Sequence, residues 1–502
     1  MTSTLADDRN LSVDLTEWAA EQPAAPALIL PGRILSYAGL DALVWRGARL
    51  LAAAGVHPGT VAGLAFRSEV LLALAVLATT RLGATFSVLS REESEREHLR
   101  VDLVIRDVAR RAATDTEPEV VFDHDGLRAF SAVPEPSLLP MRPAHAWQYL
   151  TGSGSTGTPK IMPITHRVQR ARALAARTVR ALTPSDRFLS LPDLTTHFAR
   201  TQMFYALHAG ASFCLLPRPA THAVDLCRAL RPTILDAATV HLDAMLASVR
   251  SGEEASAREA LGSVRMLMVT SSAVSQAMRR RVREVLTDRL TILYSTNESS
   301  PIACASGPEL LALSDTVGRI LPGVEARILG ADDMPVPPGQ VGVLEVRSAG
   351  MIDGYLDDPE STRAAFRDGW FRTGDLVRMA PDGQLVYCGR SDQMMIMNGI
   401  NIYPAEIERA LCEHPAVADA AVFKVAHPVH QDLPCAVVAL YPGSILSEDA
   451  LMDFAQRRLG VRRPRVIVML HAVPRNPQGK LIRARAMEAI FERLRTASGP
   501  GA

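Results

Sequence analysis

Lysine is nearly absent from this 502-residue chain. The chain has 54 basic residues, yet lysine stands only at positions 160, 424 and 480, so almost every positive charge is an arginine. An ammonium and a guanidinium differ in shape, hydration and hydrogen-bonding geometry, so a lysine kept in such a background indicates a position that arginine does not fill equally well. Lys160, Lys424 and Lys480 are therefore the first candidates for functional residues.

Net charge, paired cysteines and long apolar runs are also missing. The 54 acidic residues balance the 54 basic ones, so no overall field attracts nucleic acid or an anionic membrane, and we expect any bound polyanion to be small and held locally. The six cysteines are scattered without a CxxC pair, which excludes a disulfide framework and favours a reducing compartment. The longest apolar run, residues 70–80, is too short to cross a bilayer, and the N-terminal residues lack a signal-peptide pattern. We expect a cytoplasmic protein without membrane insertion.

Length and periodicity predict a layered α/β protein. At about 150 residues per domain the chain has room for roughly three domains, and 48% hydrophobic with 22% charged residues is a globular composition. The patterns predict helices over residues 37–54 and 69–82, and strands over 61–66 and 211–216. Proline, glycine and charged residues indicate connectors at 112–145, 330–342 and 381–392.

The chain beyond the last connector has the pattern of a small α+β unit. It contains predicted strands at 394–397, 420–425 and 436–440 and a predicted helix at 448–459. We therefore expect an N-terminal domain over residues 1–390 and a C-terminal domain over residues 391–502.

The strongest local signal is the segment Gly152-Ser153-Gly154-Ser155-Thr156-Gly157-Thr158-Pro159-Lys160. Its glycines let backbone N–H groups turn inward, its hydroxyls add donors and a lysine closes it, so it predicts a phosphate cradle. It is not a Walker A loop, because that pattern requires lysine at position 158, and it is not a nucleophile elbow. The alternative is a flexible glycine-serine linker, which does not need the Pro-Lys pair at its end.

This segment resembles the phosphate loop of the adenylate-forming superfamily, which includes acyl- and aryl-CoA synthetases, adenylation domains of peptide synthetases and firefly luciferase. Three further stretches agree in order and separation. They are Tyr294-Ser295-Thr296-Asn297-Glu298, similar to YGxTE; Trp370-Phe371-Arg372-Thr373-Gly374-Asp375 followed by Tyr387-Cys388-Gly389-Arg390-Ser391-Asp392; and Pro474-Arg475-Asn476-Pro477-Gln478-Gly479-Lys480, similar to PRxxxGK. The resemblance implies a large N-terminal domain of stacked α/β subdomains with a small β-barrel-like part, and a small mobile α+β C-terminal domain.

The resemblance also implies roles for single residues. Lys480 is expected to be catalytic and Glu298 to bind magnesium, a role that suits a hard carboxylate ligand. Asp392 occupies the hinge position and Gly399 the loop for the thiol step. The implied phosphate contacts come from Ser153, Gly154, Ser155, Thr156, Gly157 and Lys160. The implied nucleotide contacts come from Ser272, Ala273, Tyr294, Ser295, Thr296, Asn297, Asp375 and Arg390.

The acid pocket is predicted from weaker signals. Counting back from Ala209, His197 falls where peptide-synthetase domains place the aspartate that pairs with an α-amino group. A neutral imidazole or a cation there disfavours an ammonium, so we expect a carboxylic acid without an α-amino group. Asp193 could still receive an amine elsewhere on the substrate, and Ser271 replaces a glycine of the adenine-side Gly-Gly found in many members. A core or helix-start histidine remains the alternative for His197.

The sequence thus predicts a ligase that uses ATP and Mg²⁺ to adenylate a carboxylic acid and passes the acyl group to coenzyme A. The alternative acceptor is the phosphopantetheine arm of a separate carrier protein, because residues 424–432 lack the Gly-Val-Pro-Asp run common in CoA synthetases. A luciferase-like oxygenase would share the same motifs. A non-catalytic nucleotide-binding homologue is disfavoured because Lys160 and Lys480 are both present.

Overall fold

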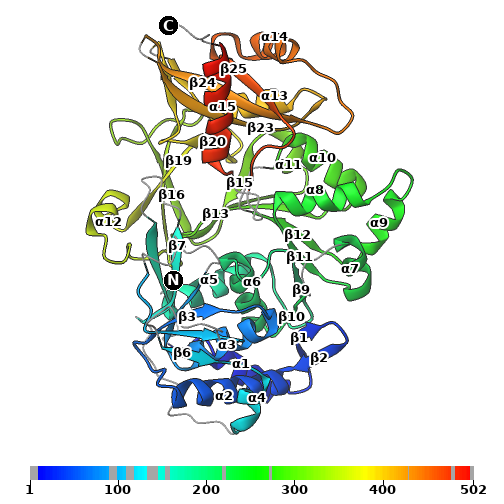
Figure 1. Cartoon of the computed structure of the whole chain (residues 1–502), viewed down its shortest axis with the longest axis vertical. Coiled ribbons are helices and arrows are strands. Elements are labelled where there is room, and N and C mark those ends of the chain that lie inside the picture. The colour runs from blue at the N-terminus through cyan, green and yellow to red at the C-terminus, as the bar shows by residue number, and fades with distance from the viewer. Residues whose placement is uncertain are drawn as a thin grey trace.

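The described strands form three β-sheets, and helices pack on them (Figure 1). The structure is a computed structural model that describes residues 9–89, 99–108, 118–132, 145–152, 159–216, 222–270, 274–398, 400–427, 429–475 and 481–497. The C-terminal sheet lies at one end of the molecule in Figure 1, and the six-stranded sheet with its helices lies toward the other. The described part of the chain contains no helix with both the length and the apolar character that a bilayer crossing requires.

The largest sheet has 14 strands among the described residues and runs through the middle of the molecule. Strands β1, β10, β9, β11, β12 and β13 pair in parallel, and from β13 onward the pairing is antiparallel. In spatial order its strands are β16 (Val324–Leu329), β17 (Gly342–Ser348), β19 (Trp370–Met379), β20 (Leu385–Arg390), β15 (Thr316–Ile320), β14 (Ser300–Ser306), β13 (Leu290–Thr296), β12 (Met266–Val269), β11 (Ile234–Ala237), β9 (Arg187–Ser190), β10 (Ser212–Cys214), β1 (Pro26–Leu30) and β2 (Arg33–Ser36), with β18 (Phe366–Arg367) on β19.

A six-stranded sheet packs against one face of the large sheet through a shared hydrophobic core. Its strands in spatial order are β6 (Glu119–Val121), β5 (Leu103–Arg106), β3 (Val61–Ala65), β4 (Thr85–Val88), β7 (Ala146–Gly152) and β8 (Lys160–Thr165). The helices of this N-terminal half are α1 (Val13–Glu21), α2 (Tyr37–Ala53), α3 (Glu69–Arg81), α4 (His124–Ala129), α5 (His166–Val179) and α6 (His197–His208). The opposite face of the large sheet has its own hydrophobic core. Four helices pack against it: α7 (Ala223–Leu230), α8 (Thr239–Ser248), α9 (Glu254–Ala260) and α10 (Gln276–Val285).

The predicted helices and strands are confirmed where the hydrophobic period of the sequence and its capping residues indicate the same element. Helix α2 begins after Ser36, whose side chain accepts a hydrogen bond from the Gly39 N–H at 3.2 Å, and Gly55 follows its end with a φ of +89°. The strand predicted over 211–216 is shorter, as β10. The connector predicted over 112–145 is wrong in part, because it contains β6 and α4.

The connector predicted over 381–392 is also wrong in part. Strand β20 occupies half of it and pairs with both β15 and β19, so tertiary pairing overrides the turn residues around it. The barrel-like part expected here is an open antiparallel extension of the large sheet. Among the described strands, β16 ends this extension at the edge of the sheet, so no barrel closes. Short helices α11 (Glu309–Ala312) and α12 (Pro359–Ala365) lie in its connections.

The C-terminal residues form a separate sheet with its own core, as the predicted α+β unit requires. Its strands are β22 (Ile400–Ile402), β21 (Met395–Met397), β24 (Gln431–Leu440), β23 (Val417–His427) and β25 (Val466–Leu470). Its helices are α13 (Pro404–Cys412), α14 (Glu448–Leu459), the short 3₁₀ helix η3 (Gly460–Arg462) and α15 (Arg483–Ala497). The fold class is therefore α/β with a large N-terminal and a small C-terminal domain.

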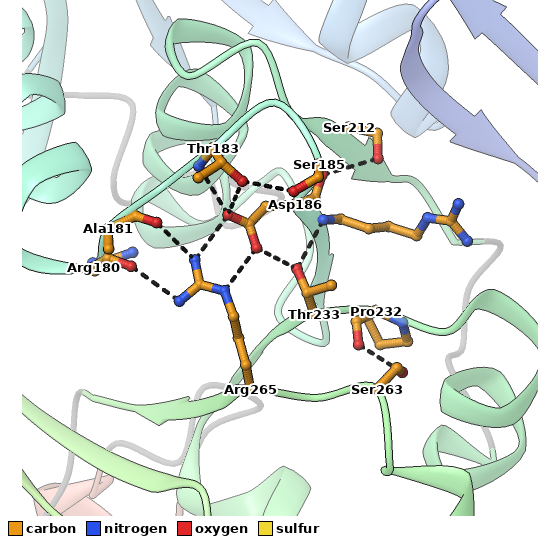
Figure 2. Close-up of polar contacts among 11 residues, drawn as sticks. Arg180, Ala181, Thr183, Ser185, Asp186, Ser212, Pro232, Thr233, Ser263 and Arg265 are labelled. Atoms are coloured by element: carbon orange, nitrogen blue, oxygen red, sulfur yellow. Dashed lines mark hydrogen bonds and ion pairs between the residues drawn. The ribbon is translucent and has the colours of Figure 1, made fainter.

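An ion pair between the buried Asp186 and the exposed Arg265 joins the amino ends of the central parallel strands. The Asp186 carboxylate accepts hydrogen bonds from Arg265 Nε at 2.8 Å and from the Thr233 hydroxyl at 2.6 Å. Figure 2 shows the Arg265 guanidinium between Asp186 and the backbone carbonyls of Arg180 and Ala181, which end helix α5. These contacts join the starts of β9, β11 and β12 to the end of α5, so the amino ends of these strands and the α5 terminus hold a fixed position relative to one another.

Candidate functional site

Three predicted nucleotide-binding residues meet at the junction of β13, β19 and β20. Pairing of β19 with β20 sets Asp375 opposite Arg390, and Arg390 Nη1 donates to Asp375 Oδ1 at 3.0 Å. The Tyr294 hydroxyl, at the end of β13, donates to the other carboxylate oxygen. Asp375 is 5% exposed; burial raises the pKa of its carboxyl, and Arg390 opposes this shift. The structure thus holds a buried, oriented carboxylate of the kind that accepts hydroxyl groups.

Gly374 explains the Thr-Gly-Asp sequence at this point. Its φ is +74°, and a Cβ there would lie 3.0 Å from the Arg390 guanidinium, so a larger residue would be strained and would displace the arginine. Arg390 also donates to the Thr373 carbonyl at 2.8 Å. Although burial by itself lowers the pKa of Arg390, the Asp375 carboxylate raises it above the ordinary value.

A second cluster joins Lys160 to Glu298 through Tyr355. The Lys160 Nζ lies 4.7 Å from the centre of the Tyr355 ring, within the range of a cation–π contact. The Tyr355 hydroxyl donates to Glu298 Oε1 at 3.0 Å. Burial first, and then the Glu298 carboxylate, raise the pKa of Tyr355, so the hydroxyl keeps its proton and remains a donor. The predicted phosphate-loop lysine and the predicted metal ligand therefore both contact Tyr355, the lysine over its ring and the glutamate at its hydroxyl.

Tyr355 was missed by the sequence reasoning, although a weak signal exists. Gly354 precedes it, and a Cβ on Gly354 would lie 2.5 Å from the Thr362 side chain, so the Gly-Tyr pair is required by a close approach. The Thr362 hydroxyl in turn accepts from the Tyr355 N–H at 2.9 Å, and the Leu356 N–H donates to the Ile161 carbonyl at 2.9 Å. These bonds attach the Tyr355 loop to the strand that begins with Lys160.

Arg172 holds the backbone that carries Glu298. This buried arginine of α5 donates to the carbonyls of Asn297 at 2.8 Å, Glu298 at 3.2 Å and Gly350 at 2.8 Å. Burial lowers the pKa of Arg172 to about 10, so the guanidinium is still charged at neutral pH. Sequence reasoning missed it because nothing in the sequence distinguishes it from the other arginines.

The other residues of the predicted nucleotide segment make local contacts. The hydroxyls of Ser295 and Thr270 lie 3.3 Å apart, and the Thr296 hydroxyl accepts from the Ser299 N–H at 3.1 Å. The Asn297 side chain is exposed. The turn after β13 is therefore shaped by its own hydroxyl groups and by Arg172.

Two of the predicted acid-pocket residues, Asp193 and His197, lie in the turn before α6 and at its first residue. His197 Nδ1 is 3.3 Å from Gln148 Oε1, and His197 Nε2 is 3.4 Å from the Thr201 hydroxyl. Burial, with Arg200 and Arg172 nearby, lowers the pKa of His197 well below its ordinary value, so the imidazole is neutral. The Asp193 carboxylate accepts from the Thr195 N–H at 3.0 Å and thus stabilises the turn that leads into α6.

Asp392 lies between β20 of the large sheet and β21 of the C-terminal sheet. Its carboxylate lies 3.5 Å from Arg390 Nε, and its carbonyl accepts a hydrogen bond from Lys424 Nζ at 3.1 Å. Lys424 is thus an exposed lysine on β23 that contacts the predicted hinge residue.

Several predicted residues lie outside the described residues. They are Ser153, Gly154, Ser155, Thr156 and Gly157 of the phosphate loop, Ser271, Ser272 and Ala273, the thiol-step Gly399, and the catalytic Lys480. The residues flanking the phosphate loop are placed, because β7 pairs with β8 and sets Gly152 opposite Lys160. Within the described ranges, no group of three or more His, Cys, Asp or Glu side chains could hold a metal ion.

Relatives with the same arrangement are known. The model of the AMP-binding enzyme family matches residues 15–356, and the model of the AMP-binding enzyme C-terminal domain matches residues 406–480. The chain belongs to the AMP-binding enzyme family. This AMP-binding enzyme is 31% identical to indoleacetate–CoA ligase of Aromatoleum aromaticum over 93% of the chain and 96% of the relative. It is 29% identical to the salicyl-AMP ligase / salicyl-S-ArCP synthetase of Mycobacterium tuberculosis over 98% and 91% of the two chains.

The fold of this AMP-binding enzyme is also that of a solved structure. The ATP-bound MatB of Rhodopseudomonas palustris superposes with a TM-score of 0.86, covering 95% of this chain and 98% of that chain at 23% sequence identity. The large and small domains found above are therefore the fold of an adenylate-forming enzyme.

Proposed function

We propose that this AMP-binding enzyme activates a carboxylic acid with ATP, releasing pyrophosphate, and then transfers the acyl group from the acyl-adenylate to the thiol of coenzyme A. The observation that carries the proposal is the contact of Lys160 and Glu298 with Tyr355. It brings together an ammonium and a carboxylate that the motifs assign to phosphate and metal binding, although the two residues lie far apart in the sequence.

The nucleotide would lie across the carboxyl end of β13. Asp375 would accept the ribose hydroxyls, with Arg390 and Tyr294 fixing the two carboxylate oxygens from either side. Ser295, Thr296 and Asn297, on the turn that Arg172 holds, would line the phosphates together with Lys160 and the segment 153–157. Ser272 and Ala273 would contact the base.

The Glu298 carboxylate suits magnesium. Within the described chain it makes one hydrogen bond, from the neutral Tyr355 hydroxyl, and no ion pair, so its other lone pairs are available, and Mg²⁺ is commonly held by one or two carboxylates together with substrate phosphates. Glu298 would hold the ion, which when bound would supply positive charge at the phosphates.

The adenylation step needs two anions to approach each other. A carboxylate oxygen of the acid attacks the α-phosphate and pyrophosphate leaves, so positive charge must be placed where negative charge develops. Lys160 would contact the leaving phosphates and Lys480 would contact the acid carboxylate and the α-phosphate. The neutral His197, with Asp193 and Ser271, would border the acid.

The second step needs a different surface at the same site. We propose that the domain over residues 391–502 rotates about Asp392 relative to residues 1–390, so that Lys480 serves adenylation and Gly399 serves thiol transfer. The contacts of Asp392 with Arg390 and Lys424 support this assignment, because they join β20 of the large domain to β23 of the small one. A carrier-protein thiol is the alternative acceptor, favoured by the missing Gly-Val-Pro-Asp run.

The test is acid-dependent pyrophosphate release from ATP and Mg²⁺, with and without coenzyme A. The panel contains aryl, short-chain, medium-chain and amino-substituted acids. Release that coenzyme A accelerates, with a thioester as product, supports the proposal. Release that coenzyme A leaves unchanged assigns a carrier protein as acceptor, and no release with any acid contradicts the proposed activity.

A further inference from the structure

One buried carboxylate has no partner in the described structure. Asp236, on β11, is 0% exposed, and neither of its carboxylate oxygens makes a hydrogen bond. A buried carboxylate without a hydrogen bond or counter-charge is costly, so native structures hold such groups where a further partner is supplied or where they serve a function. Burial raises the pKa of Asp236 to about 7, with Arg180 opposing the shift.

Asp236 faces the α6 side of the sheet. Alternate residues of a strand point to opposite faces, and Ile234, two residues earlier, belongs to the core that contains Ala199 and Met203 of α6. Leu235 and Ala237 belong to the core on the other face. Asp236 therefore shares its face with Ile234 and points toward the layer of α5 and α6.

The neighbours of Asp236 on this face do not satisfy it. In register beside it stand Ser190 on β9 and Met268 on β12. The Ser190 hydroxyl donates instead to the Pro192 carbonyl at 2.9 Å, and Met268 carries no donor. Arg180 Nη1 donates to Gln202 Oε1 at 2.6 Å, and no ion pair joins Arg180 to Asp236 in the described chain.

Asp236 lies next to the segments that form the predicted acid pocket. It is the third of the four residues of β11, near the carboxyl end of the strand, where parallel sheets bind their ligands. The Leu191 N–H donates to the Asp236 carbonyl at 2.9 Å, and the chain then continues through Asp193 to His197. Strand β12 pairs with β11 on its other side and ends at Val269. The Asp193 carboxylate, the alternative receptor for an amine, is already bonded to Thr195.

We propose that Asp236 is a specificity-determining residue of the acid pocket, and that the substrate is a carboxylic acid with a protonated amine on a carbon other than the α-carbon. This inference rests on the proposed function. The ammonium would donate to the Asp236 oxygens, which make no hydrogen bond in the described structure. An α-ammonium would instead lie beside the neutral His197, with Arg200 and Arg172 nearby, where positive charge is disfavoured.

The first test uses the unmodified enzyme and matched pairs of acids. Acid-dependent pyrophosphate release is compared for 3-aminobutanoate against butanoate and for 3-amino-3-phenylpropanoate against 3-phenylpropanoate. The α-amino acids of the same carbon skeletons, 2-aminobutanoate and 2-amino-3-phenylpropanoate, are included. We expect kcat/KM for at least one amino acid to exceed that of its des-amino partner on the order of 10³-fold, because a buried group left unpaired rejects the analogue that lacks its partner.

The second test is Asp236→Asn, which keeps the shape and removes the negative charge. We expect kcat/KM for the preferred amino acid to fall about 100-fold and the preference over the des-amino partner to fall to about tenfold or less. Asp225→Asn, at an exposed aspartate of α7, is the matched control and should change neither value. Circular dichroism and melting temperature show whether the variant folds. If it does not fold, the preference of the unmodified enzyme for amino acids over their des-amino partners decides whether the proposal holds.

The outcomes separate this inference from the proposed function. Release with des-amino acids at equal or higher kcat/KM, or a preference unchanged in a folded Asp236→Asn variant, overturns the role of Asp236 and leaves the ligase activity standing. A preference for α-amino acids overturns the placement of the amine. No release with any acid overturns the proposed function itself.

Discussion

Replacement of Tyr355 by phenylalanine isolates one atom of the candidate site. The phenyl ring keeps its position against Lys160, whose Nζ lies 4.7 Å from the ring centre, while the hydroxyl that donates to Glu298 at 3.0 Å is lost. The orientation of Glu298 then depends only on its backbone, which Arg172 holds through the Asn297 and Glu298 carbonyls.

The size of the effect follows from the kind of bond. A hydrogen bond to a charged group contributes about 1.5–3 kcal/mol, which corresponds to about 10- to 150-fold in rate if the bond is used in the transition state. We therefore expect Tyr355→Phe to lower kcat/KM for ATP by about 10- to 150-fold. We also expect it to raise the Mg²⁺ concentration needed for half-maximal rate, with KM for the acid unchanged.

The assay is acid-dependent pyrophosphate release at varied ATP and Mg²⁺. Tyr441→Phe is the matched control, because Tyr441 is 44% exposed and lies in the small domain away from this cluster. A folded Tyr355→Phe enzyme with unchanged kcat/KM and unchanged Mg²⁺ dependence would refute the reasoning that Tyr355 positions Glu298.

Three further predictions concern a nucleotide contact, the fold and the catalytic lysine. Asp375→Asn should weaken ATP binding by about 1.5–3 kcal/mol, read as a raised KM for ATP, because it removes the charged acceptor and the hydrogen-bonded counter-ion of Arg390; an unchanged KM would contradict the ribose assignment. Asp186→Asn should lower the free energy of unfolding by about 2–3 kcal/mol at pH 7, since Asp186 accepts two hydrogen bonds from Arg265, and urea unfolding measures this. Although burial raises the pKa of Asp186, the hydrogen bonds to its carboxylate lower it below the ordinary value of 3.8. The stabilisation is therefore present above pH 3.8 and is lost as the pH falls through the lower pKa of the folded state. An Asp186→Asn variant whose stability depends on acid as strongly as that of the wild type would contradict this reasoning. Lys480→Ala should reduce acyl-adenylate formation on the order of 10³-fold while the melting temperature stays the same, and intact formation would refute the mechanism at its centre.

Much of the architecture could be predicted from local sequence. The helix over 69–82 is found as α3 because its apolar residues and the Ser68 cap agree, and the helix over 448–459 is found as α14 with the same bounds. The prediction failed at β20, where Pro381, Asp382 and Gly383 mark a turn but the strand after them pairs on both sides. Turn residues show where a chain bends, and they do not show which strands flank the bend.

The candidate site was predicted unevenly for a physical reason. Asp375, Arg390, Tyr294, Glu298 and Lys160 lie in motifs with a distinctive order, and the structure brings them into two clusters. Tyr355, Arg172 and Asp236 carry no such signal, because each matters only through what it meets in space. The clusters concern placement only, and the role assigned to each site residue, including Asp193, His197, Asp392 and Lys480, remains a prediction.

The sequence by itself determined the class of chemistry. The patterns that indicate it are local, because each consists of residues that follow one another in the sequence. They are a glycine-rich loop closed by a rare lysine, an acidic turn after a strand and a Gly-Lys turn near the end of the chain. Only the tertiary structure decided that Tyr355 joins Lys160 to Glu298 and that Asp236 is buried without a partner facing α6. Both depend on which side of a strand faces which helix, and this is fixed by long-range packing that no single segment of the chain contains.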